Sequence, residues 1–278
     1  MADIRSIQDT VALNNGVKMP TLGLGTWRSA DGAEVEQAVR DALDIGYRHI
    51  DTASFYKNEE GIGRALRASK LPREQIFVTT KVWNDAQRAG PGAVEKAFEE
   101  SRSKLGLDVI DLYLVHWPVQ GCFVRTWETM QKLLAAKKVR AIGVSNFLPH
   151  HLDQIKGQLV PAVNQIEWHV RLQSPELVKR CQKDGIVVEA WSPLMQGKIG
   201  QVPELLALAK QLGKTPAQVA LRWGLQKGLV MIPKSVKRHR LEENAGLYDF
   251  KLTAEQVATL DKLDQNARIG PNPDAITF

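Results

Sequence analysis

The chain has 278 residues, 44% of them hydrophobic and 24% charged, which argues against a disordered or fibrous protein and allows a large core. Its net charge of +6 comes from basic residues dispersed among acidic ones, without the aromatic-plus-basic platform of a nucleic-acid binder. No apolar run approaches the roughly 18 residues of a membrane span, and MADIRSIQDT lacks the apolar core of a signal peptide. We therefore expect a cytoplasmic protein without membrane or nucleic-acid partners, in which Cys122 and Cys181 are structural thiols.

After an N-terminal hairpin, short β-branched runs alternate with amphipathic stretches. The hairpin is expected over residues 10–20, TVALNNGVKMP, with Asn15 and Gly16 in the turn. Eight strands are expected after it, at TLGLGTW (21–27), YRHID (47–51), QIFVTTKV (75–82), VIDLYLVHW (109–117), VRAIGVSN (139–146), PAVNQIE (161–167), GIVVEAW (185–191) and LVMIPKS (229–235). Apolar residues at helical spacing separate the strands, as from Pro175 to Asp184 and from Pro216 to Gln226, each with proline in the first turn.

Eight strand–helix units predict an α/β fold in which parallel strands close into a (β/α)8 TIM barrel, a fold of about 250 residues. We expect one domain over residues 1–278, with the hairpin at its start and extra segments at Gly197–Leu212 and Thr253–Leu263. A doubly wound open sheet is the alternative. The first strand–helix turn lacks the GxGxxG that such a sheet uses to bind a dinucleotide, so we favour the barrel.

The candidate catalytic residues stand at the ends of neighbouring strands, where (β/α)8 barrels place their active sites. Asp51, Lys81 and His116 are ionisable groups in or beside buried runs, and each alone could be structural, as an ion pair or a hydrogen-bonded histidine. Together with Tyr56 they form a workable proton-transfer site. We expect Lys81 to lower the pKa of Tyr56, Asp51 to fix Lys81, and His116 to orient a carbonyl oxygen. The set predicts carbonyl reduction.

Six segments of the chain resemble the aldo-keto reductase family: GYRHIDTASFYKNEE, TTKVWN, DLYLVHWP, IGVSNF, AVNQIEWH and IPKSVKRHRLEEN. The resemblance covers nearly the whole chain and is closest to bacterial members akin to 2,5-diketo-gluconate reductases. It implies NADPH-dependent reduction of aldehydes and ketones, including dicarbonyls and keto-sugar acids. It implies that Asp51, Tyr56, Lys81 and His116 are the catalytic tetrad. Hydride would pass from nicotinamide C4 to the carbonyl while Tyr56 donates the proton.

The resemblance also implies the cofactor contacts. Ser145, Asn146 and Gln165 match the residues that bind the nicotinamide carboxamide, and Trp191 matches the aromatic that stacks on the ring, although a core tryptophan is the alternative. The other matching positions are Ser192, Leu194, Lys234, Ser235, Val236, Arg240, Glu243 and Asn244.

A basic cluster directly after the eighth strand carries the choice of cofactor. Lys234 and Arg240 are expected to bind the adenosine 2′-phosphate, since a cation there helps NADPH alone. The start of the following helix adds N–H donors for an anion. Lys237 and Arg238 fit either this pocket or a solvated face.

Substrate contacts are implied at Trp27, Trp83, His116 and Trp117. The short stretch WPVQGCFVRTW after His116 predicts an open pocket and broad specificity, and the sequence leaves open whether NARIGPNPDAITF covers it. EWHVRLQ departs from the family pattern, and we expect its Arg171 to be exposed.

Two other functions fit the sequence less well. A nucleotide-sensing binding protein would share the barrel and cofactor, but the intact tetrad argues against it. A metal-dependent hydrolase would need several ligands at the strand ends, where only His116 and His169 are candidates, so we expect no metal. We expect a monomer acting on a small-molecule carbonyl substrate.

Overall fold

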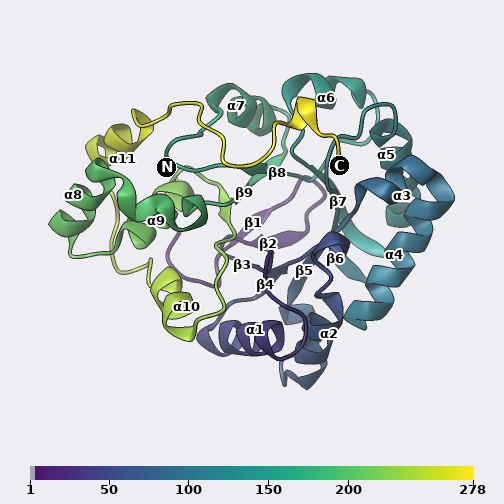
Figure 1. Ribbon diagram of the computed structural model, residues 1–278, viewed down its shortest axis with the longest axis horizontal. Helices are drawn as coiled ribbons and strands as arrows, with labels where there is room; N and C mark the ends of the chain where they lie inside the picture. The colour runs from purple at the N-terminus through teal and green to yellow at the C-terminus, as the bar shows by residue number, and fades with distance from the viewer. Residues whose placement is uncertain (1–3) are drawn as a thin grey trace.

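In the computed structural model, which describes residues 4–278, eight parallel strands form a barrel surrounded by helices (Figure 1). The strands are β3 (Leu24–Gly25), β4 (His49–Asp51), β5 (Phe77–Val82), β6 (Ile110–Val115), β7 (Val139–Ser145), β8 (Val163–Glu167), β9 (Val187–Trp191) and β10 (Val230–Met231). They pair in chain order, and isolated parallel bridges from Leu22 to Met231 and from Gly25 to Lys234 join the last strand to the first. The sheet therefore closes, which confirms the predicted barrel.

Helices follow the strands around the outside of the barrel. They are α1 (Ala33–Ile45), α2 (Glu59–Ala68), α4 (Pro91–Leu105), α5 (Phe123–Ala135), α6 (Pro149–Gln154), α7 (Pro175–Lys183), α9 (Pro216–Gln226) and α10 (Arg238–Ala245). Further helical segments are η1 (Ser54–Tyr56), η2 (Arg73–Gln75), α3 (Asn84–Ala89), η3 (Met195–Gln201), α8 (Pro203–Leu212), α11 (Ala254–Asp261) and η4 (Pro273–Ala275). No helix within residues 4–278 is long and apolar enough to cross a membrane.

The first and last strands are shorter than the sequence predicts. Pro233 has no N–H with which to continue the ladder of β10. A Cβ on Gly25 would lie 2.8 Å from the Ile232 carbonyl oxygen, so these two strands cross too closely for a side chain at that point. Part of the stretch expected to form a loop after His116 is helical, because α5 already begins at Phe123.

The hairpin closes the end of the barrel where the strands begin. Its strands β1 (Thr10–Ala12) and β2 (Lys18–Pro20) are antiparallel, and Gly16 in the turn has a φ of 84°, which favours glycine. Leu13 and Met19 are buried in one apolar cluster with strand residues such as Phe77. The predicted hairpin is confirmed, and it plugs the barrel. The first three residues of MADIRSIQDT, where the sequence predicts no signal peptide, lie outside the described residues. That residues 1–278 form a single domain stays a prediction.

The C-terminal segment, yellow in Figure 1, crosses the opposite end of the barrel. The backbone N–H groups of Ile269 and Gly270 donate to the buried Glu167 carboxylate, at 2.6 and 3.0 Å. Burial raises the pKa of Glu167, but His169 and these two N–H groups outweigh it and hold the pKa below its usual value. The Phe278 ring stacks on Trp83, with centroids 5.7 Å apart. Contrary to the open pocket expected from a short loop, this segment covers part of the mouth.

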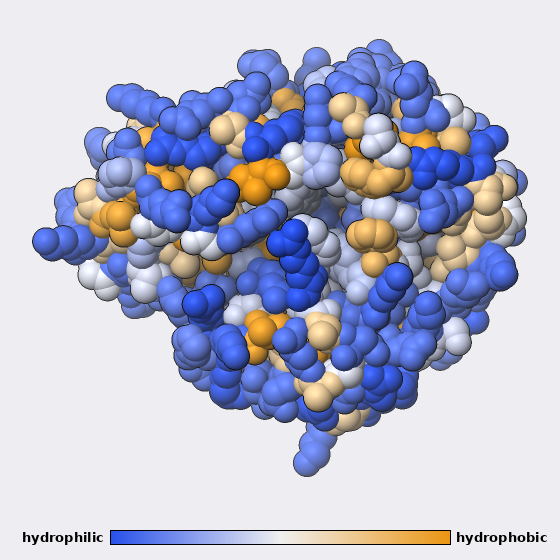
Figure 2. Space-filling model, viewed as in Figure 1, coloured by the Kyte–Doolittle hydropathy of each residue, from blue (hydrophilic) through white to orange (hydrophobic). Residues whose placement is uncertain are grey.

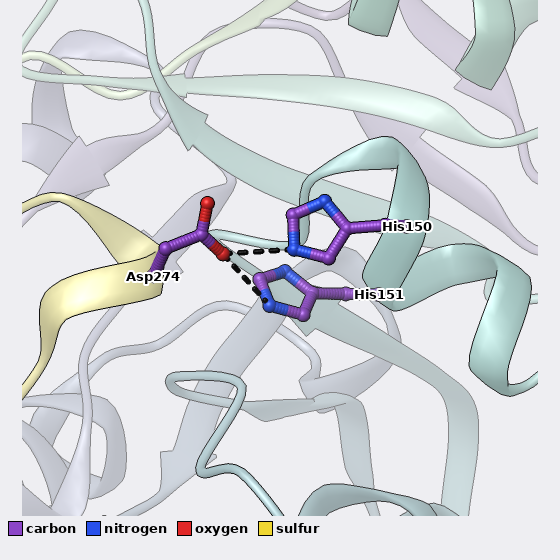
Figure 3. A group of neighbouring side chains, drawn as sticks. All are labelled: His150, His151 and Asp274. Atoms are coloured by element: carbon purple, nitrogen blue, oxygen red, sulfur yellow. Dashed lines mark hydrogen bonds and ion pairs between the residues drawn. The ribbon is translucent and has the colours of Figure 1, made fainter.

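A cluster of His150, His151 and Asp274 fastens the same segment to α6 (Figure 3). Asp274 Oδ1 lies 2.8 Å from His150 Nε2 and 3.3 Å from His151 Nε2. These atoms have metal-ligand spacing, but the Leu148 N–H donates to His151 Nδ1 at 3.1 Å. Nε2 must then carry the proton of the neutral ring, which occupies the position a metal would need. The cluster therefore holds the C-terminal segment to α6 by hydrogen bonds, and its protonation pattern suits a metal ion poorly.

Candidate active site

The centre of the site is a buried ion pair between two neighbouring strands. Lys81 Nζ on β5 lies 2.7 Å from Asp51 Oδ1 on β4 and donates to the Thr52 carbonyl at 2.8 Å. The two residues are 0% and 2% exposed. Burial lowers the pKa of Lys81, but Asp51 and Tyr56 more than compensate and hold it above its usual value. Lys81 is therefore a fixed cation.

Tyr56 lies in η1, just past the end of β4. Lys81 Nζ is 5.1 Å from the centroid of its ring. Burial raises the pKa of Tyr56, and the opposing effect of Lys81 is smaller, so the expectation of a net lowered pKa is wrong. The cause is the dry setting, which disfavours a phenolate more than one ammonium favours it. Tyr56 accordingly keeps its proton and can act as an acid.

His116, at the end of β6, contacts Tyr56 edge to face with ring centroids 5.7 Å apart. Burial and, secondarily, the charge on Lys81 hold its pKa well below the usual value, so the ring is neutral. Its Nδ1 is buried and has no hydrogen-bond partner in the described part of the chain, residues 4–278. A neutral imidazole still has one N–H to donate, so His116 can polarise a carbonyl oxygen without competing as a proton donor.

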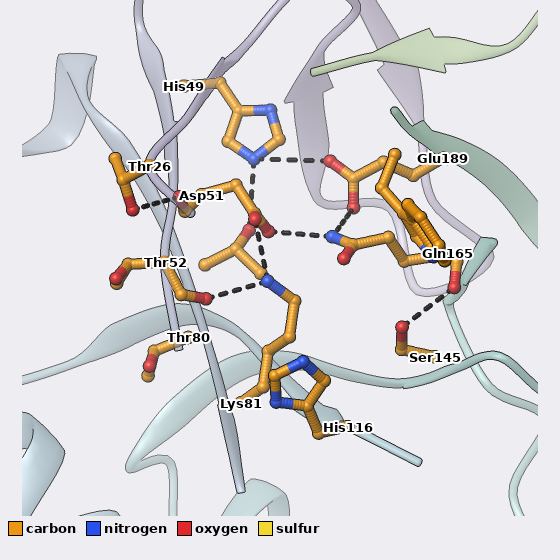
Figure 4. Close-up of polar contacts among 12 residues, drawn as sticks. Thr26, His49, Asp51, Thr52, Thr80, Lys81, His116, Ser145, Gln165 and Glu189 are labelled. Carbon is orange, nitrogen blue, oxygen red and sulfur yellow. Dashed lines mark hydrogen bonds and ion pairs between the residues drawn. The ribbon is translucent and has the colours of Figure 1, made fainter. Parts of the chain in front are cut away.

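Gln165 connects this centre to residues that the sequence analysis did not select (Figure 4). Its Nε2 donates to Asp51 Oδ2 and to Glu189 Oε2, both at 2.7 Å. Glu189 and His49 face each other inside the barrel, with Glu189 Oε1 3.6 Å from His49 Nε2. Strand periodicity could have identified Glu189: it stands two residues before Trp191 in β9 and therefore shares its face.

The predicted nicotinamide contacts lie together at the ends of β7, β8 and β9. The Ser145 hydroxyl donates to the main-chain carbonyl of Gln165 at 2.8 Å, and the Asn146 side-chain amide donates to the main-chain carbonyl of His116 at 3.0 Å. Asn146 Oδ1 accepts the indole N–H of Trp191 at 2.9 Å. Trp191 is only half-buried, unlike a core tryptophan, and a Cβ on Gly270 would lie 2.4 Å from its ring.

The basic cluster after β10 divides into bound and free cations. Arg238 is paired with Asp41 at 2.9 Å and with Glu242 at 3.0 Å, which favours the solvated-face interpretation for this residue. Arg240 is exposed and has no ion pair within residues 4–278. Lys234 is also largely exposed, although the loss of water around part of its side chain lowers its pKa.

The other predicted cofactor positions surround these cations or the start of η3. Ser235 and Asn244 are buried, whereas Val236, Glu243, Ser192 and Leu194 are half-buried. Ser235 Oγ accepts the Lys237 N–H at 3.1 Å, just before α10 begins. Free cations, a helix start and half-buried side chains suit a phosphate-bearing nucleotide.

An aromatic wall forms the predicted substrate side. Phe55 stacks on Trp83 with centroids 3.8 Å apart, and Trp117 meets Phe278 edge to face at 5.5 Å. Trp27 is 36% exposed and lies under Arg28, whose Cζ is 4.2 Å from the ring centroid. Figure 2 shows that this face of the molecule is hollowed near its centre. Sequence reasoning missed Phe55 and Phe278, since neither belongs to a strand.

One expectation about the surroundings is wrong. Arg171 is half-buried rather than exposed, and its guanidinium lies 3.6 Å from Glu204 of α8. Its backbone carbonyl accepts the Ala267 N–H at 2.9 Å, which helps to hold the start of the C-terminal segment.

A tyrosine acid beside a neutral imidazole, with a fixed cation behind it, is suited to adding hydrogen to a carbonyl group. The fold and site therefore define an oxidoreductase of the (β/α)8 barrel class.

Comparisons with known proteins give the family. The model of the Aldo/keto reductase family matches residues 21–265. The chain is 47% identical over 275 residues to glyoxal reductase of Bacillus subtilis, covering 98% of this chain and 99% of the relative. It is 44% identical over 270 residues to methylglyoxal reductase DkgA of Salmonella typhimurium, covering 95% and 96%. A solved mutant of Gox0644 in complex with NADPH has a TM-score of 0.92 and 39% identity, covering 99% of this chain and 100% of that one. This chain belongs to the aldo/keto reductase family and is an oxidoreductase acting on carbonyl groups.

Proposed function

We propose that Asp51, Tyr56, Lys81 and His116 carry out the reduction of aldehydes and ketones to alcohols with NADPH. The observation that carries this assignment is the buried Lys81–Asp51 pair, 2.7 Å apart, with Lys81 Nζ 5.1 Å from the Tyr56 ring. His116 holds the carbonyl oxygen and Tyr56 gives it a proton. Lys81 then stabilises the phenolate, and Asp51 keeps Lys81 charged and in place.

The cofactor is NADP(H), which when bound supplies the hydride. Gln165, Ser145 and Asn146 hold the carboxamide of its ring, and Trp191, fixed by Asn146 at 2.9 Å, supports the ring. Arg240 and Lys234, together with the start of α10, bind the 2′-phosphate. The absence of an ion pair at Arg240 within residues 4–278 supports this, because a cation without a protein partner is available to a ligand.

The substrates that the site suits are small carbonyls, among them dicarbonyls, keto-sugar acids and aromatic aldehydes. Phe55, Trp83, Trp117 and Phe278 form a firm apolar wall, and the C-terminal segment narrows the mouth. Two relatives are named for glyoxal and methylglyoxal, which supports dicarbonyls. Keto-sugar acids are included because the sequence motifs resemble those of 2,5-diketo-gluconate reductases.

The test is the loss of NADPH absorbance with a methylglyoxal-type dicarbonyl, an aromatic aldehyde and a keto-sugar acid, run beside NADH. We expect turnover with all three and a preference for NADPH. Tight NADPH binding without turnover on any carbonyl would contradict the reductase and indicate a nucleotide sensor.

We further propose that the protein acts as a monomer in the cytoplasm and binds no nucleic acid. In support, surface cations such as Arg180 are paired with acidic groups, here Asp153 at 2.8 Å and Asp184 at 2.6 Å. Light scattering of the purified protein measures the oligomeric state.

A further inference from the structure

A second carboxyl lies beneath the catalytic ion pair. Glu189 on β9 is 0% exposed and stands two residues before Trp191, on the same face of the strand. The Gln165 amide nitrogen donates to it and to Asp51 at the same distance, 2.7 Å (Figure 4). Neither the catalytic tetrad nor the expected cofactor contacts include Glu189, although it accepts a hydrogen bond from Gln165, which also donates to Asp51 of the tetrad.

The local charges do not balance if both carboxyls are ionised. Lys81 neutralises Asp51 across 2.7 Å. His49 is near Glu189, but burial and then Lys81 lower the pKa of His49 to about 3, so its ring is neutral. Glu189 Oε1 is buried without a hydrogen-bond partner among residues 4–278. Asp51 and Glu189 both accept hydrogen bonds from the Gln165 amide, and the charge of Lys81 is paired with Asp51. Within residues 4–278, Glu189 is thus the carboxyl that lacks a counter-charge.

The surroundings of Glu189 hold its pKa well above the usual value of a carboxyl. Asp51 and His49 face it from β4, Lys81 from β5 and Tyr56 from η1, while Val230 of β10 is apolar. Burial, and then the charge on Asp51, raise the pKa of Glu189 to about 8. Because an acid with a raised pKa stays protonated at lower pH, the pocket gains its extra negative charge only on the alkaline side.

We propose that Glu189 is a titrating charge that sets the relative affinity of the site for the oxidised and the reduced cofactor. This rests on the proposed function, which places the nicotinamide ring against Gln165 and Trp191. The oxidised ring carries a formal positive charge and the reduced ring carries none, so an ionised Glu189 favours the oxidised form. Glu189 touches neither ring nor substrate directly; it acts through Gln165 and through space.

The test is the ratio of the dissociation constants of NADP+ and NADPH, measured by tryptophan quenching from about pH 6 to about pH 10. Both cofactors carry the same 2′-phosphate, so its titration cancels in the ratio. In the wild type we expect NADP+ to gain about tenfold over NADPH as pH rises. Glu189→Gln keeps an oxygen to accept from Gln165 and is neutral at every pH, so its ratio should stay flat.

Glu59→Gln is the matched control. Glu59 is also buried with a pKa that burial raises, but Thr80 and Ser101 hydrogen-bond it, outside the Asp51–Gln165 network. This variant should keep the wild-type pH dependence. Infrared difference spectra between about pH 6 and about pH 10 should also show a carboxylic-acid band that Glu189→Gln lacks and Glu59→Gln retains.

Two outcomes would overturn the inference: a wild-type ratio that does not change with pH, or an equal change in wild type and Glu189→Gln, which would assign the titration to Asp51 or Tyr56. Neither outcome affects the proposed function, which is read from turnover by Tyr56→Phe. Full turnover by that variant would overturn the catalytic assignment while the binding ratio could still be measured.

Discussion

The two ends of the barrel are built from the same strands and have opposite chemistry. Where the strands begin, apolar side chains such as Phe77 and Val163 pack with Leu13 and Met19 of the hairpin plug. Where they end, the interior holds an ion pair, an amide shared by two carboxyls and the neutral ring of His116. One strand can serve both ends: β5 starts at Phe77 and carries Lys81 near its finish.

The difference shows how the barrel separates stability from reactivity. Apolar burial at the plugged end stabilises the fold by about 25 cal/mol for each Å² removed from water. The buried charges at the other end cost desolvation energy that a well-packed apolar set would avoid. Variants at the two ends should therefore differ in kind, affecting chemistry at one end and unfolding at the other.

The largest effect is expected at the reactive end. Tyr56→Phe removes the hydroxyl that we propose as the proton donor and keeps the ring, so turnover should fall roughly 100- to 10,000-fold with NADPH binding retained. Steady-state kinetics and tryptophan quenching measure the two quantities. Near wild-type turnover would show that another group protonates the alkoxide.

At the plugged end, Met19→Ala removes a side chain that is 0% exposed. The cavity should lower the free energy of unfolding by about 2–5 kcal/mol. Denaturant unfolding measures this loss, and turnover per folded molecule should match the wild type. If Met19→Ala instead had wild-type stability and poor turnover, the plugged end would affect chemistry, which would contradict the division of stability and reactivity between the two ends.

The smallest effect concerns the rim of the reactive end. Arg240→Ala should weaken NADPH binding about 10- to 100-fold and leave NADH binding nearly unchanged, because only NADPH carries the 2′-phosphate. Arg238→Ala is the control, since its guanidinium is already paired with Asp41 and Glu242. Equal losses for both cofactors in Arg240→Ala would remove the phosphate assignment.

Strand order and the tetrad's meeting at one end of the barrel could be predicted, because both depend on local patterns. Apolar runs mark the strands, and a charged residue ending a buried run marks the site, as at Asp51 and Lys81. Glu189 could not be predicted in this way, because it lies within its strand and its connection to the site runs through Gln165 to Asp51, far away in sequence.

The net direction of the Tyr56 pKa and the course of the C-terminal segment depend on tertiary structure. The first follows from how much burial outweighs one nearby ammonium. The second follows from acceptors that the fold collects from distant elements, such as Glu167 for the N–H groups of Ile269 and Gly270. Neither the direction of this pKa nor the path of the C-terminal segment can be predicted from a local stretch of sequence.

The two hydrogen bonds of the Gln165 amide fix more than its own orientation. Both of its N–H hydrogens are committed to carboxyls, so only its carbonyl oxygen is left to meet a ligand. Whatever lies against that oxygen must itself offer a hydrogen. A carboxamide can donate an N–H to it. A carboxylate in the same place would set its own oxygens against the Gln165 side-chain oxygen, and these would repel one another. Gln165 thus makes the pocket distinguish an amide from the corresponding acid, two groups of nearly identical shape.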